Sequence, residues 1–159
     1  MATWGELRAA RPDLAAAGAS LLYQHGVGLA FLATVRADGG PRVHPMCPVL
    51  HEAELFAFLV PSPKRDDLLR DGRYSMHSFP ADDNEDAFYV SGGAWRVDDE
   101  SVRTAVVARY LTERGDRALE RASGLDEQIL FRFDIEACLL TRTDGHGDPA
   151  PRHTTWHDR

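Results

Sequence analysis

The feature that most constrains the fold is a pair of apolar segments joined by a short, glycine-rich turn. Residues 27–35, VGLAFLATV, form a nearly continuous apolar run. Residues 37–40, ADGG, place glycine beside aspartate and so supply the positive φ that a tight hairpin demands. Residues 41–50, PRVHPMCPVL, return as a second strand. Pro45 and Pro48 cannot donate to a strand ladder, so part of this segment must be an edge, a bulge or a barrel corner.

Further strands follow the hairpin in series. We expect them at residues 55–60, 73–79, 88–99 and 129–143. The paired Gly92 and Gly93 indicate a β-bulge or a close approach by another segment. In the last strand, Ile129, Phe131 and Phe133 alternate with other residues at the period of a strand. Six strands, mostly antiparallel, favour a small closed barrel, because closure removes exposed strand edges.

Short helices are expected around these strands. Thr3 and Glu6 have the spacing of a capping box, and Pro12 suits the first turn of a second helix, so we expect N-terminal helices within residues 3–25. Asp98 or Asp99 would cap a later helix. With 159 residues, the chain suits a single domain, and its tail, residues 145–159, is predicted to be loosely structured.

Charge and composition narrow the function classes. A net charge of −7 argues against nucleic acid as a partner, since duplex binding depends on neutralising phosphates. No apolar run approaches a membrane span, and no signal peptide is seen, so the sequence predicts a cytoplasmic protein. Cys47 and Cys138 lie in apolar stretches and are read as small buried side chains. No metal site is predicted, because His153 and His157 have no convincing third ligand.

The single lysine of the chain stands at a candidate anion site. Ser62 is a natural N-cap and Pro63 a natural first residue for a short helix that Gly72 would end. Lys64 and Arg65 then place two cations beside free backbone N–H groups and the positive end of the helix dipole, an arrangement that suits a phosphate. The alternative is that both are solvated helix residues.

Three segments in this order resemble one known family. LATVRADGGPRVHPMCPVL, LFAFLVPSPKRDDLLRDGRYSMHS and DAFYVSGGAWRVDD resemble the pyridoxamine 5′-phosphate oxidase-like family of flavin-binding split barrels. The resemblance implies a mainly β chain with flanking helices, built on a six-stranded antiparallel split β-barrel. It also implies a homodimer with flavin mononucleotide (FMN) in a cleft at the subunit interface.

The same resemblance implies roles for particular residues. Ser62 and Lys64 would contact the flavin phosphate, with Arg65 near it. The strand after the hairpin would line the flavin ring. Trp95 and Arg96 would approach from the partner subunit. The ring-lining residues implied in this way are Arg42, Val43, His44, Pro45 and Met46.

Some positions depart from the pattern of the oxidases proper. His44 stands where those enzymes have an arginine, and Val49 where they have a lysine. The tail also lacks their set of arginine and histidine that holds the substrate phosphate. The sequence therefore predicts a relative and not a pyridoxamine phosphate oxidase, with fewer charges to hold the cofactor.

Three hypotheses follow from these residues and the resemblance. The first is a flavin-dependent oxidoreductase acting on a small molecule, with FMN as cofactor or a deazaflavin in its place; no catalytic residue is assigned. The second is a non-catalytic protein that carries or senses a flavin, a deazaflavin or heme, with His44 or His77 as a heme ligand. The third is a dimer that has kept the fold and lost the cofactor.

Overall fold

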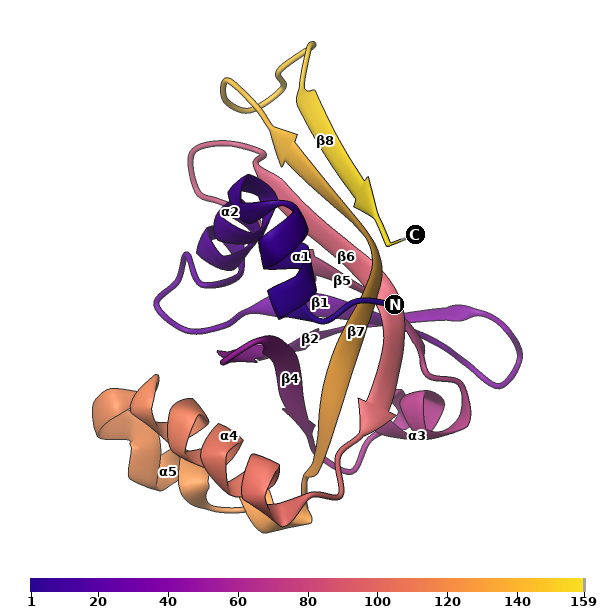
Figure 1. Cartoon of the computed structure of the whole chain (residues 1–159), viewed down its shortest axis with the longest axis vertical. Coiled ribbons are helices and arrows are strands. Elements are labelled where there is room, and N and C mark those ends of the chain that lie inside the picture. Colours follow the sequence, from indigo (N-terminus) through magenta and orange to yellow (C-terminus); the bar gives the residue numbers. More distant parts are fainter. Residues whose placement is uncertain (159) are drawn as a thin grey trace.

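The computed structural model describes residues 1–158, apart from the side chains at positions 119 and 121. One curled antiparallel sheet forms its centre, and the helices lie around that sheet (Figure 1). The strands are β1 (Ala30–Val35), β2 (Pro41–Met46), β3 (Val49–His51), β4 (Glu54–Leu59), β5 (Arg73–Ser78), β6 (Ala87–Arg96), β7 (Ile129–Arg142) and β8 (Arg152–His157). The helices are α1 (Trp4–Ala10), α2 (Pro12–Leu22), α3 (Pro63–Arg70), α4 (Glu100–Thr112) and α5 (Ala118–Ala122), with 3-10 turns η1 (Gly115–Arg117) and η2 (Leu125–Glu127).

The sheet is open and not closed. Its strand order is β2-β1-β5-β6-β7-β4-β3, with β8 added on β7. Among the described strands no pair joins β2 to β3, so the structure is a half-barrel instead of the closed barrel that the sequence favoured. The segment predicted as one strand over 41–50 divides at Cys47 and Pro48 into β2 and β3, which form the two ends of the sheet. Proline therefore stands at sheet edges, as its missing N–H requires.

The predicted hairpin and bulge are both present. β1 and β2 pair antiparallel around a turn in which Gly39 has a φ of 82°, and the Arg36 N–H donates to the Gly40 carbonyl oxygen at 2.9 Å. The register of β6 against β7 shifts between Ser91 and Gly92. A side chain at Gly92 would collide with the backbone of Asp134, so the bulge and the close approach occur together.

One edge of β7 is completed by three separate segments. Residues 129–132 pair with β4, Ala2 bridges to Ile135, and residues 137–142 pair with β8. Figure 1 shows both ends of the chain beside this strand. The prediction of a loosely structured tail is therefore wrong for residues 152–157, which form β8, and the sheet has eight strands where six were expected.

The helices cover the inner face of the sheet. The Thr3–Glu6 capping box is confirmed, and α1 and α2 bury Leu7, Leu14 and Leu22 against sheet residues such as Phe88. A second, smaller cluster packs Val106 of α4 against β3 and β4. No helix within the described residues is long and apolar enough to cross a membrane.

Alternate residues of the sheet remain on an outer face, which we define by nine residues. They are Phe31, Ala33 and Val35 on β1, Val43 and Pro45 on β2, Ser75 and His77 on β5, and Tyr89 and Ser91 on β6. All nine are partly or fully exposed, whereas their neighbours Leu32, Met76 and Val90 are fully buried. The outer face therefore presents apolar strand residues that this chain does not cover.

Candidate functional site

The candidate phosphate site lies where β4 turns into α3. Ser62 has an extended backbone and occupies the N-cap position, as predicted, and Pro63 is the first helical residue. The Ser62 hydroxyl does not cap the helix, however, because it donates to the carbonyl oxygen of Val60 at 2.9 Å. The Arg65 N–H donates to the Ser62 carbonyl oxygen at 3.0 Å. The backbone N–H of Lys64 is therefore the main-chain donor that this turn offers to an anion.

The Lys64 side chain reaches from α3 to β2. Its ammonium group is half-buried and donates to the carbonyl oxygen of Pro45 at 2.8 Å. Within residues 1–158 no carboxylate lies within ion-pair distance of it. Burial lowers the pKa of Lys64, an effect that the nearby Cys47 thiol opposes. This cation is thus partly desolvated without a counter-charge.

Arg65 also has unused hydrogen-bonding capacity. Its guanidinium makes one long contact of 3.4 Å to the carbonyl oxygen of Glu127, and its buried Nε has no hydrogen-bond partner among the described residues. An unpaired buried donor costs free energy, which a bound acceptor would recover. Lys64 and Arg65 together therefore fit a phosphate at this turn.

Arg42 is committed to a different partner. Its Nε donates to Asp67 on α3 at 2.7 Å, and the Thr34 hydroxyl donates to the same carboxylate at 2.9 Å. Arg70 reaches the other oxygen of Asp67 at 3.3 Å. Burial alone would raise the pKa of Asp67, but these hydrogen bonds outweigh it and hold the pKa below its usual value. In this arrangement Arg42 joins the hairpin to α3 through its Nε–H.

The other predicted residues of β2 divide between surface and core. Val43, His44 and Pro45 are exposed, so each is accessible to a bound molecule or a second chain. Met46 is buried in the core with 6% of its surface exposed. Residues that pair across adjacent strands share a face, so His44 lies on the side of Leu32, away from the outer face.

Trp95 does not join this site within one chain. It is half exposed on β6 and lines a small cavity with residues of β4 and α4, including Glu54 and Val102. Its neighbour Arg96 pairs with Asp98 at 2.5 Å. A role for Trp95 at a cofactor stays a prediction that requires a second subunit.

His77 has a ligand geometry that the sequence alone does not reveal. It is exposed on the outer face, and its Nδ1 lies 2.7 Å from the carbonyl oxygen of Ser78. A carbonyl can only accept, so Nδ1 carries the proton in this contact, and Nε2 is the ring nitrogen left for another partner. No group of three or more potential metal-ligating side chains occurs in the part of the chain that the structure describes. His77 therefore suits a metal that brings its other ligands with it.

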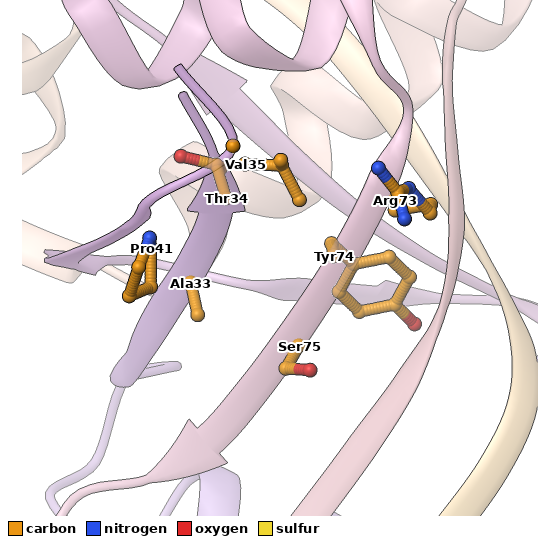
Figure 2. A pocket seen from close by; sticks show the side chains of 8 residues that line it. Ala33, Thr34, Val35, Pro41, Arg73, Tyr74 and Ser75 are labelled. Carbon is orange, nitrogen blue, oxygen red and sulfur yellow. The ribbon is translucent and has the colours of Figure 1, made fainter. Parts of the chain in front are cut away.

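Figure 2 shows a cavity between β1, β5 and the hairpin turn. Its volume is about 250 Å³, and residues such as Ala33, Pro41, Arg73 and Ser75 line it. Arg73 forms an ion pair with Asp71, whose carboxylate lies 2.6 Å from the guanidinium. None of the predicted cofactor residues lines this cavity. It is an indentation of the outer face beside the hairpin, and one chain alone does not build an enclosed cofactor pocket there.

Sequence reasoning did not anticipate two buried carboxylates. Asp67 anchors α3, and Glu113 at the end of α4 receives hydrogen bonds from Tyr23 at 3.0 Å and Arg109 at 2.8 Å. Both lie in strongly polar helical segments, where most acidic residues are exposed. Long-range contacts distinguish Asp67 and Glu113 from exposed acidic residues, so the local sequence pattern does not predict the burial of either.

Comparisons with known proteins reveal similarity at the level of structure. No family model matches the sequence, and no curated protein matches it. A heme-binding protein from Mycobacterium smegmatis superimposes with a TM-score of 0.67 and 16% identity over 92% of this chain. This chain spans 59% of the length of that protein.

Two further solved structures align over most of both chains. HutZ, the heme storage protein from Vibrio cholerae, gives a TM-score of 0.62 and 19% identity over 79% of this chain and 89% of its own. The other is a Clostridium acetobutylicum protein related to general stress protein 26, of the pyridoxine phosphate oxidase family. It gives a TM-score of 0.63 and 12% identity over 91% of this chain and 96% of its own. The chain therefore has the split-barrel fold of pyridoxine phosphate oxidase-like proteins, with an open antiparallel half-barrel and flanking helices.

Proposed function

We propose that this protein is an FMN-dependent oxidoreductase that works as a homodimer on a small molecule. The proposal combines the fold, which it shares with a protein of the pyridoxine phosphate oxidase family, with the cations at the start of α3. FMN would supply the redox chemistry. The chain would supply an anchor for the phosphate and a shaped surface for the ring, and we assign no catalytic residue.

The observation that carries the proposal is the state of Lys64. This ammonium group is half-buried, and among the described residues it has a main-chain carbonyl and no carboxylate as partner. A structural lysine is normally solvated or paired, since a desolvated charge without a counter-charge is costly. A phosphate dianion at this turn would stabilise Lys64 and also reach the neighbouring Arg65, whose Nε lacks a partner.

The outer face supports a second subunit. Val43 and Pro45 lie on this face, on the edge strand that also bears the Lys64 contact, and Val43 is 58% exposed. Apolar strand residues next to a phosphate anchor would let a second copy complete the cleft. Trp95 of a partner would then be available to contact the ring.

The proposal is tested by FMN titration of the purified protein, followed by absorbance and calorimetry. We expect the protein to bind FMN, and we expect Lys64→Ala to weaken that binding by about 1.5–3 kcal/mol, the value of a hydrogen bond to a charged group. Arg36→Ala, in the exposed hairpin turn, is the matched control and should bind as the native chain does. A folded protein that binds neither FMN nor a deazaflavin would contradict the proposal, and binding of the deazaflavin alone would change the cofactor.

A second candidate function is heme binding through His77. Two of the similar structures are described as heme-binding or heme-storage proteins, and the Nε2 of His77 is free to ligate iron from the exposed outer face. His44 cannot ligate the same iron from the same chain, since it lies on the opposite side of the sheet. Heme reconstitution should then give a Soret band that His77→Ala removes and His44→Ala retains. A spectrum unchanged in the His77 variant would rule out this ligand.

A further inference from the structure

A further cavity lies at the opposite end of β2 from the hairpin, between the α2–β1 connection and the end of α4. Its volume is about 410 Å³, within the range of sites that hold small molecules. Val27, Leu29, Cys47 and Tyr110 give it apolar walls. The other charged or titratable residues that line it are His25, Glu113, Arg114 and Arg117.

Glu113 is the unusual member of this lining. Its side chain is only 6% exposed, and one carboxylate oxygen, Oε1, accepts from Tyr23 and Arg109. The other, Oε2, is buried and has no hydrogen-bond partner among the described residues. The guanidinium of Arg114 lies 3.9 Å from it, which is an ion-pair distance but too long for a hydrogen bond.

Stability does not explain this arrangement. A buried ion pair with an unsatisfied oxygen commonly costs more than apolar residues of the same size would, so its presence needs another reason. Arg114 is held over the Tyr110 ring at 3.4 Å and donates to the Tyr110 carbonyl oxygen at 2.9 Å. Arg114 is thus held beside Glu113 at the wall of the cavity, and Glu113 Oε2 is left without a hydrogen bond among the described residues.

The rest of the lining complements an anion. Arg117 is exposed at the cavity and makes no ion pair within the described residues. Within the lining itself, the two guanidinium groups of Arg114 and Arg117 face a single carboxylate, that of Glu113. A ligand that satisfies both features needs a carboxylate for the arginines and an adjacent N–H or O–H for Glu113.

We propose that this cavity binds a small α-amino or α-hydroxy acid with an apolar side chain. The carboxylate faces Arg114 and Arg117, and the amine or hydroxyl donates to Glu113 Oε2 once the Arg114 guanidinium has turned toward the carboxylate. The apolar side chain lies against Val27 and Leu29. The proposal rests on the cavity alone and does not depend on FMN or heme.

The test is calorimetric titration of the full chain with four matched probes. L-leucine and 2-hydroxy-4-methylpentanoate carry both groups, 4-methylpentanoate lacks the donor, and leucinol lacks the carboxylate. We expect the first two to bind at least about tenfold more tightly than the last two, as the loss of a charged hydrogen bond implies. Equal binding of all four, or binding of none, would overturn the proposal.

Variants then assign the groups. Glu113→Gln should reduce binding of L-leucine and leave that of 4-methylpentanoate unchanged. Arg117→Ala should weaken the binding of both L-leucine and 4-methylpentanoate. Because Arg117 is exposed, we expect this variant to fold, and it tests the site even if Glu113→Gln does not fold. Arg36→Ala is the control for loss of a surface arginine. L-leucine binding that survives both cavity variants would place the ligand elsewhere and refute this site.

Discussion

Asp67 holds α3 in the position that presents Lys64. Its buried carboxylate receives Arg42 from β2, Thr34 from β1 and Arg70 from its own helix. Because these contacts join three elements, the placement of the phosphate site depends on a residue that contacts no ligand. Arg42, which the family resemblance implies at the flavin ring, contacts Asp67 of this helix through its Nε–H.

Replacing Asp67 should therefore destabilise the protein in a pH-dependent way. Asp67→Asn keeps the shape but removes the charge that Arg42 and Arg70 share, so we expect a loss of about 2–3 kcal/mol at neutral pH. The pKa of Asp67 is lowered in the folded state, so its stabilisation is present above the unfolded pKa of about 4 and is lost as the pH falls through the folded pKa.

Denaturant unfolding at pH 7 and near pH 3 measures this effect. The difference in free energy of unfolding between the native chain and Asp67→Asn should be large at pH 7 and smaller near pH 3. Asp66→Asn is the matched control, since Asp66 is the exposed neighbour on the same helix. A difference that is equal at both pH values would show that charge is not what Asp67 contributes.

At the scale of elements, β8 is the segment that sequence reasoning missed. Its residues, RHTTWH, are mostly polar and exposed, and only the partly buried Trp156 packs against the core. The strand exists because β7 has a free edge over residues 137–142, and the pairing fills that edge. Such an edge strand depends on a partner distant in sequence and leaves little local signal.

Trp156 should carry most of the energy that β8 contributes. We expect Trp156→Ala to lower the free energy of unfolding by about 1–3 kcal/mol, less than for a fully buried tryptophan because part of the ring is exposed. Thr155→Ala, on the exposed side of the same strand, should have little effect. Thermal and denaturant unfolding of both variants provide the measurement, and equal effects would mean that β8 contributes through its backbone alone.

The elements that were predicted correctly are those with local chemistry. The hairpin follows from the glycine turn at 37–40, α1 from its capping box, and the bulge in β6 from the pair Gly92 and Gly93. The start of α3 was also predicted, because Ser62 and Pro63 specify it. The hydrogen bonds of the Ser62 hydroxyl and the Lys64 ammonium were not predicted. Each group donates to a main-chain carbonyl whose position is set only by the folded chain.

At the scale of the whole molecule, the open half-barrel has one protected face and one unprotected face. The helices bury the inner face, whereas the outer face leaves Phe31, Val43 and Pro45 partly or fully exposed. Among the described strands, the open sheet also ends in unpaired edges at β2 and β3. A second copy placed on the outer face would cover apolar residues of β2, the edge strand whose Pro45 carbonyl oxygen receives Lys64.

The association of two chains can be tested without any cofactor. Val43 is one of the nine residues of the outer face, whereas Val60 follows β4 and is not among them. The two valines are 58% and 48% exposed. If the outer face is the subunit interface, Val43→Glu buries a charge there and should shift the molar mass in solution from dimer toward monomer. Val60→Glu should leave the mass unchanged, because its new charge remains in water.

FMN titration of the Val43→Glu variant connects association with the cofactor. A cleft shared by two subunits requires that Val43→Glu also lose FMN affinity, although Val43 carries no group that binds phosphate. Raising the protein concentration should then restore both the dimer and FMN binding in parallel, since association is driven by mass action. A monomeric Val43→Glu protein that binds FMN as the native chain does would place the cofactor within one subunit, and the role expected for Trp95 of the partner would fail with it.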